Sequence, residues 1–164
     1  MAVDLFLKLD GIESESKDDK HKKEIDVLAW SWGMSQSSHA GMGGGMSAGK
    51  VNIQDFSVTK YIDKASPLLM LNCSNGATIA KGTFTCRKAG GKTGAIEYLK
   101  IHLKELLITS VSTGGSGGED KFTENVTMAF DEVKVEYTEQ TDTGGGGGTT
   151  RYEWNAAKNK GSGG

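Results

Sequence analysis

Residues 97–140 have the sequence EYLKIHLKELLITSV (97–111), STGGSGGED (112–120) and KFTENVTMAFDEVKVEYTEQ (121–140). The first and third segments predict the two strands of a hairpin, and the glycine-rich segment predicts its turn. Each arm is roughly three times as long as a typical strand of about 5–6 residues. Such an arm extends past the core of one small domain, and its free edge favours aggregation unless another chain pairs with it or covers it. The hairpin therefore indicates an assembling protein.

The apolar residues change face part-way along both arms. The alternating series shifts from Leu99, Ile101 and Leu103 to Leu106 and Ile108, and from Phe122, Val126, Met128 and Phe130 to Val133, Val135 and Tyr137. Such shifts predict bulges or bends, which curve a sheet. On the polar face, the basic residues at 100, 102 and 104 are expected to pair across the hairpin with Glu132 and Glu136.

Shorter period-two patterns predict further strands on both sides of the hairpin. These strands are expected at 3–9, 25–34, 51–59, 81–88 and 151–154. A charged loop is expected at 13–24, and a loop rich in Ser, Gly and Met at 35–50.

The two faces of the strand at 25–34 differ in side-chain size. The large face, predicted to enter the core, consists of Leu28, Trp30, Trp32 and Met34. The small face, predicted to be exposed, consists of Val27, Ala29, Ser31 and Gly33. Lining of a ligand pocket by the two tryptophans is the less favoured alternative to core packing.

One helix is predicted from Ser66, a suitable N-cap, followed by Pro67 at the first helical position and ended by Gly76. A short apolar helix among six or more strands is typical of a β-barrel that the helix plugs or flanks. The expected fold is therefore mainly β: a β-barrel with one main α-helix and a long extended loop. One domain is expected at 1–155, followed by a disordered tail at 156–164.

Composition and charge exclude several classes of protein. The 164 residues carry a formal net charge of −2 with both signs interspersed, so no surface for nucleic acid or anionic membrane is expected. No apolar run is long enough to span a bilayer. The N-terminal residues lack a basic leader and a cleavage site, so folding in the cytoplasm and exit without a cleaved signal peptide are expected. Cys73 and Cys86 are expected to be reduced packing residues.

Two glycine loops, at 44–50 and 90–93, partly match a phosphate-binding loop. In the first, Val51 stands where a magnesium-binding Ser or Thr is required. Both loops precede strand patterns instead of the helix whose N-terminus would face the phosphates. A nucleotide-hydrolysing enzyme is therefore disfavoured.

The remaining reactive side chains show no catalytic or metal-binding spacing. His21 lies in the charged loop and is expected to be solvated, His39 lies in the Gly/Met loop, and His102 lies on the polar face of a long strand. Neither cysteine lies in a Cys-x-x-Cys pair, and no carboxylate pair stands out for acid–base catalysis. The chain is expected not to be an enzyme and to need no cofactor or metal.

Several long motifs resemble the Hcp family, the tube proteins of bacterial type VI secretion. The motifs are Met1–Asp4 with Phe6, Glu24–Ser37, Thr59–Lys64, Arg87–Gly91, Glu97–Leu99 and Val111–Asp120. They occur in the family's order, and the resemblance covers residues 1 to 154. The glycine run at 144–148 and the tail Lys158–Gly164 lie outside the shared pattern.

The resemblance implies a six-membered ring with a central hole, and rings that stack into a tube inside a contractile sheath. Family members are ejected into target cells, and some carry effector proteins within the ring. The implied partners are further copies of the chain, sheath proteins, a VgrG-type spike and secreted effectors. The implied localisation is the bacterial cytoplasm, followed by secretion through the type VI apparatus. A phage-type tail tube protein or, less favoured, a monomeric barrel for small ligands are the alternatives.

Two functional sites are expected on this basis. Ser31, the polar side chain of the small face at 25–34, is expected to line the hole of the ring and to contact effectors. The glycine-rich loop is expected to dock onto the next ring, because its methionines can adapt to a partner surface. Its predicted contact residues are Gly41, Met42, Gly43, Gly44, Gly45 and Met46.

Overall fold

The computed structural model describes residues 3–39, 47–88, 94–141 and 146–164. Its elements are β1 (Val3–Leu9), β2 (Ile25–Val27), β3 (Ala29–Ser31), β4 (Met34–His39), β5 (Ser47–Ile53), β6 (Phe56–Tyr61), α1 (Ser66–Asn75), β7 (Thr78–Lys88), β8 (Ile96–Gly114), β9 (Thr123–Gln140), β10 (Gly146–Asn155) and β11 (Lys160–Gly163). The prediction of a mainly β fold with one helix is confirmed.

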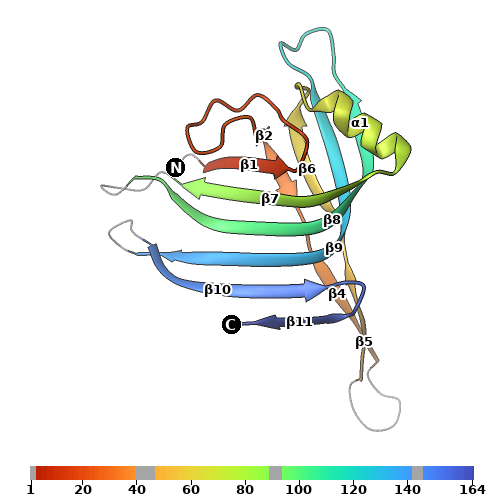
Figure 1. Cartoon of the computed structure of the whole chain (residues 1–164), viewed down its shortest axis with the longest axis vertical. Helices are drawn as coiled ribbons and strands as arrows, with labels where there is room; N and C mark the ends of the chain where they lie inside the picture. The colour runs from red at the N-terminus through yellow and green to blue at the C-terminus, as the bar shows by residue number, and fades with distance from the viewer. Residues whose placement is uncertain (1–2, 40–46, 89–93, 142–145) are drawn as a thin grey trace.

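Nine of these strands form one curved sheet, and β4 and β5 form a separate two-stranded ribbon. The main path is β11-β10-β9-β8-β7-β1-β2, with β6 paired to β9 and β3 paired to β6 (Figure 1). Among the described strands this sheet is not a closed barrel, contrary to the prediction. The strand expected at 25–34 breaks at Leu28 into β2, which pairs with β1, and β3, which pairs with β6.

The two long strands β8 and β9 belong to both parts of the curved sheet. In Figure 1 one half of each strand runs across the view, between β7 and β10, and the other half bends to run along the long axis in the same part of the sheet as β6. Glu105 has a positive φ of 52° and is skipped between the pairs Lys104↔Glu132 and Leu106↔Phe130. Leu103 and Leu106 are consequently both buried. The predicted change of face on the first arm is confirmed.

The core lies inside the curve of this sheet. Trp30 contacts two buried rings there, with centroids 6.0 Å from Phe56 and 5.0 Å from Phe84. Trp30 and Trp32 thus pack against the core as predicted. Leu28 and Met34, predicted on the same face, are instead 45% and 44% exposed. The break at Leu28 changes the face, and β4 leaves the sheet at Met34.

Helix α1 ends where the sequence predicts, but it begins one residue earlier, at Ser66 instead of Pro67, and its N-terminus is stabilised differently. Gly76 follows the helix with a φ of 67°, as expected for the residue that ends it. Ala65, not Ser66, occupies the N-cap position, and its backbone N–H donates to the Asp63 carboxylate at 2.9 Å. The hydroxyl of Ser66 is buried beside Lys60 and Glu124.

The charged loop at 13–24 is held against the sheet by His21. This ring is only 7% exposed, contrary to the prediction that it is solvated. Its Nδ1 lies 2.8 Å from Glu24 Oε2, its Nε2 lies 2.6 Å from Glu97 Oε1, and it stacks on Phe6 at 4.3 Å. Arg87 adds an ion pair to Asp18 at 2.5 Å. Local sequence does not reveal these partners, because two of them come from other strands.

The C-terminal residues differ from the disordered tail predicted at 156–164. The strand predicted at 151–154 extends over β10, and β11 pairs with it in the register Tyr152↔Gly163 and Trp154↔Gly161. A Cβ on Gly161 would collide with the carbonyl oxygen of Glu153 and the ring of Trp154, so this approach requires glycine.

Candidate functional site

The outer face of β3, β6, β9 and the distal part of β8 carries two transverse rows of small side chains. The strand registers place Ser31, Ser57, Thr127 and Ser110 in one row. The next row contains Ala29, Thr59, Asn125 and Ser112. We call these eight residues the small polar face. None of them is charged, and Ser31 lies at one end of its row.

The alternation of side chains along these strands explains why the rows face outward. The neighbouring residues Trp30, Val58, Val126 and Val111 all pack into or against the core. The residues of the two rows alternate with these core residues along each strand, so their side chains must point away from the core. Ser31 is exposed, as the sequence predicts for the small face of its strand. Val27, predicted on that face, is buried because β2 lies on the other side of the break at Leu28.

Hydrogen bonds between side chains connect neighbouring strands across the small polar face. The Thr59 hydroxyl donates to Asn125 Oδ1 at 2.6 Å. Thr127 Oγ1 lies 2.5 Å from Ser110 Oγ and 2.7 Å from Thr109 Oγ1. Thr109 in turn donates to the Asp55 carboxylate at 2.7 Å. These bonds hold the small side chains flat against the sheet.

Both lateral edges of the small polar face lack a strand partner among the described residues. The pairing of β7 with β8 ends at Thr78↔Leu107, so β8 has a free edge from Ile108 to Gly114. On the opposite side, β3 pairs with β6 alone. The four-stranded segment therefore presents two different free edges, which face away from each other.

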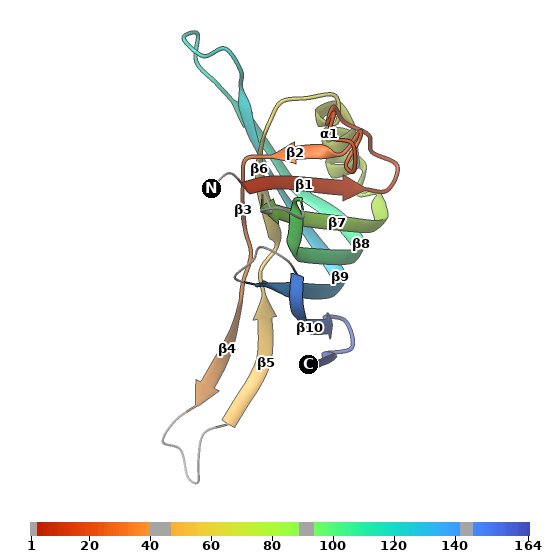
Figure 2. The ribbon, with the colours of Figure 1, turned by 90° about the vertical axis from the view of Figure 1, so that its left-hand side faces the viewer.

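The ribbon of β4 and β5 extends from the end of this segment, away from α1 (Figure 2). The pairs Met34↔Ile53 and Gln36↔Val51 place three apolar side chains on one face of the ribbon. Its base is tied to the sheet by Trp32, whose Nε1 donates to the carbonyl oxygen of Gln54 at 2.9 Å.

The ribbon replaces most of the loop predicted at 35–50. The described residues 35–39 and 47–50 are strand. The predicted docking residues Gly41, Met42, Gly43, Gly44, Gly45 and Met46 lie outside the described residues. The strand predicted at 51–59 is interrupted by Gln54 and Asp55, where the chain passes from β5 to β6.

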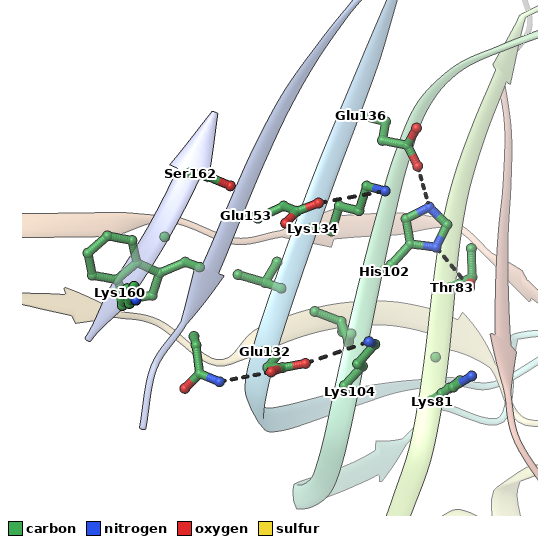
Figure 3. Close-up of a pocket in the computed structure, with 16 residues that line it drawn as sticks. Lys81, Thr83, His102, Lys104, Glu132, Lys134, Glu136, Glu153, Lys160 and Ser162 are labelled. Carbon is green, nitrogen blue, oxygen red and sulfur yellow. Dashed lines mark hydrogen bonds and ion pairs between the residues drawn. The ribbon is translucent and has the colours of Figure 1, made fainter. Parts of the chain in front are cut away.

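A second surface, on the outer side of β7 to β11, is strongly charged (Figure 3). It contains an open groove of about 610 Å³. His102 Nε2 lies 2.8 Å from Glu136, Lys104 lies 3.7 Å from Glu132, and Lys134 lies 3.7 Å from Glu153. Charge pairing across the long hairpin is therefore confirmed for His102 and Lys104.

The described residues also show what the reactive side chains do. Cys73 and Cys86 are free, and burial raises the pKa of the Cys86 thiol to about 11, so it stays protonated at neutral pH. The described residues contain no group of His, Cys, Asp and Glu arranged to hold a metal ion.

The two glycine loops are followed by strand, in β5 and β8, where a phosphate site requires a helix. The one described helix is too short to cross a membrane.

The sequence pointed to Ser31 but not to the rest of the small polar face. Each contributing strand alternates apolar and small polar residues, as in Phe56–Thr59 and Asn125–Met128. That signal was present. The sequence does not show the register that aligns the four strands, because residues far apart in the sequence form the rows.

Comparisons with known proteins place the chain in a family. The family model described as "Type VI secretion system effector, Hcp" matches residues 6–137. Protein hcp1 of Pseudomonas aeruginosa is 57% identical over 160 residues, which cover 97% of this chain and 98% of that protein.

Two solved structures are similar to this chain in both sequence and fold. Hcp1 from Salmonella typhimurium is 40% identical with a TM-score of 0.81, covering 99% of this chain and 100% of that one. A structure described as a type six secretion system protein is 30% identical with a TM-score of 0.91, covering 98% of this chain and 100% of that one. The chain therefore belongs to the Hcp family of secreted type VI secretion tube proteins.

Proposed function

We propose that six copies of this chain form a ring, that rings stack into the inner tube of a type VI secretion apparatus, and that effectors travel in the central hole. The observation that carries the proposal is the pair of free edges that flank the small polar face. Membership of the Hcp family supports the proposed number of copies and the stacked tube.

The free edges favour a closed ring. The distal edge of β8 in one copy can pair with the edge of β3 in the next, which satisfies backbone groups that are otherwise open. The two edges are different surfaces, so the contact is heterologous and closes into a ring if the rotation per copy permits. A continuous cylinder of strands would result, with the small polar face repeated around it.

The small polar face suits the inner wall of that cylinder. Its side chains are short and uncharged, and four of them are hydrogen-bonded in pairs, so an effector can lie close to the wall without facing buried or unpaired charges. Ser31 lies at the end of a row, beside the proposed boundary between copies. The residue is thus placed to contact effectors, and the mixed charges of the groove in Figure 3 then face outward, where sheath proteins would lie.

The ribbon suits a contact between rings. It continues the long axis of the four-stranded segment and carries the apolar residues Met34, Val51 and Ile53 on one face. An isolated two-stranded ribbon is at best marginally stable in water, so a partner surface would stabilise it. Residues 41–46 at its end are the proposed docking residues, and a VgrG-type spike would cap the last ring of the tube.

The mass of the particle in solution tests the ring. Size-exclusion chromatography with light scattering is expected to give about six chain masses, and negative-stain microscopy is expected to show rings with a central hole. A monomer at micromolar concentration would reject the ring and favour a small binding domain. A variant with Thr109→Pro and Val111→Pro, which blocks the distal edge of β8, should dissociate the ring, because proline removes the N–H groups needed for pairing.

A matched control distinguishes the loss of an edge from a loss of folding. The outer-face variant Lys134→Gln changes an exposed charge on β9 and should leave the ring intact. Circular dichroism of the proline variant should retain the strand signal, because Val111 is only partly buried and the fully buried Ile108, Val126 and Met128 are unchanged.

A further inference from the structure

We propose that the turn of the β8–β9 hairpin and the residues at its base form the surface that receives the ribbon of the next copy in the stack. In this contact Lys50 of the ribbon pairs with Glu119 and Asp120 of the turn. The apolar face of the ribbon covers Tyr61, Ile62 and Phe122. The inference rests on the proposed stacking of rings and names the surface that stacking uses.

The two surfaces lie at opposite ends of the molecule. In both views the ribbon extends to one end of the long axis, while the turn between β8 and β9, drawn in cyan, projects at the other end (Figures 1 and 2). Identical copies arranged end to end along this axis would bring the ribbon of one against the turn of the next. Such a contact is heterologous and repeats without closing, which is the geometry of a tube.

The charges of the two surfaces are complementary. Lys50 is exposed and is the one charged residue among the described residues of the ribbon. Glu119 and Asp120 are exposed at the turn. Across the described part of the chain, none of the three forms an ion pair. Opposite charges without internal partners favour correct docking over other orientations.

The apolar groups are matched as well. Tyr61, Ile62 and Phe122 are 39%, 43% and 45% exposed at the base of the hairpin. The backbone N–H of Ile62 donates to the carbonyl oxygen of Phe122 at 2.9 Å, so the end of β6 and the start of β9 form one surface. At the other end of the molecule, Met34 is 44% exposed on the ribbon. Burying these groups against each other removes apolar area from water at both ends.

A charge-swap series tests the pairing. Lys50→Glu, and separately Glu119→Lys with Asp120→Lys, should leave the ring mass unchanged and raise the concentration required for tube formation about tenfold, since like charges then face each other. Combining the three substitutions should restore tube formation to near the wild-type concentration. Pelleting by ultracentrifugation and negative-stain microscopy measure the tubes. Lys160→Glu, a charge reversal on β11 away from both surfaces, is the control.

A second pair of variants tests the apolar contact. Phe122→Ser should weaken tube formation, whereas Leu71→Ser, which changes a more exposed leucine on α1, should not. Tubes that form equally well with Lys50→Glu, or a combined variant that shows no rescue, would overturn this inference while leaving the proposed function intact. Wild-type rings that never stack would overturn both, and the absence of rings would reject the proposed function itself.

Discussion

Lys60 and Glu124 form an ion pair in which both side chains are completely buried. They are directly paired residues of β6 and β9, and they face the core side of the strands that carry the small polar face. Asp63 lies 3.0 Å from the Lys60 ammonium group, and Ser66, at the start of α1, lies 3.2 Å from it. The pair thus joins the first turn of the helix to two strands of the sheet.

Removal of one partner of this pair should be costly. Lys60→Met leaves the carboxylate of Glu124 buried without its cation, and we expect a loss of about 3–5 kcal/mol in the free energy of unfolding. The double variant Lys60→Met with Glu124→Leu removes both charges and should recover most of that loss. Lys104→Met, which breaks an exposed pair at 3.7 Å, should cost less than about 1 kcal/mol. Urea denaturation measures all three, and equal losses for Lys60→Met and Lys104→Met would contradict the prediction.

Truncation of Trp30 should also destabilise the fold strongly. The ring packs against both Phe56 and Phe84, so Trp30→Ala leaves a cavity beside them and is expected to cost about 3–5 kcal/mol. Tyr137→Ala, at an aromatic residue that is 49% exposed, is the control and should cost far less. The midpoints of denaturant unfolding measure the loss of stability in the two variants.

The local sequence pattern is sufficient to predict most helices and strands of this fold. It is insufficient to predict which face of some strands is buried and which distant residues contact each other. The hairpin, its change of face near Glu105 and the end of α1 at Gly76 depend on neighbouring residues, and all are present. The exposure of Leu28 was missed, because period-two alternation continues through the point where the strand changes its pairing partner.

Long-range contacts explain the other differences between the predictions from sequence and the structure. His21 looks solvated in sequence because its neighbours are charged, yet its ring is buried against Phe6 and bonded to Glu97, which is 76 positions away. The small polar face likewise depends on registers between strands separated by large parts of the chain. Residues of the ribbon were predicted as a loop because serine and glycine are common in turns, although β4 and β5 pair there.

The contact between His21 and Glu97 predicts a pH dependence of stability. Burial alone would raise the pKa of Glu97, but hydrogen bonds from His21 and Lys100 outweigh that effect and hold the pKa below its usual value. A carboxyl group with a lowered pKa in the folded state stabilises the fold above its unfolded pKa of about 4.3. That contribution is lost as the pH falls through the lower, folded-state pKa.

Wild type should therefore exceed Glu97→Gln in stability at about pH 5, and the gap should shrink below about pH 4. Urea denaturation at each pH measures the gap. Glu139→Gln, which removes the charge of an exposed carboxylate elsewhere on β9, serves as the control. A gap that widens on acidification would contradict the assigned role of Glu97.

Replacement of Ser31 tests the inner wall of the ring. Ser31→Gln places a longer polar side chain on the small polar face, and we expect an intact ring that retains a co-expressed effector less well. Light scattering reports the ring, and co-purification reports the effector. Lys134→Gln introduces the same residue on the outer face and should leave effector retention unchanged. Failure of the Ser31 variant to form rings would instead place this residue in the contact between copies.

The ribbon offers the final test, because it can be shortened without altering the core. Replacing residues 41–48 by a two-residue turn leaves Trp32, Gln54 and the small polar face untouched. Ordering a glycine-rich segment costs about 1–2 kcal/mol of backbone entropy per residue, so a single subunit gains no stability from this segment unless a partner binds it. Thermal stability and ring mass should therefore remain close to those of the wild type.

Tube formation at high protein concentration and secretion from cells should both be lost in the shortened variant, because the ribbon can no longer reach the next ring. An equal number of residues replaced by a Gly/Ser linker of unchanged length is the matched control. This control keeps the length of the ribbon and removes only the methionine contacts, so it distinguishes the loss of reach from the loss of those contacts. If rings of the shortened protein stack as well as those of the wild type in negative-stain images, residues 41–48 are not the docking element, and the rest of the ribbon or another part of the rim must hold the rings together.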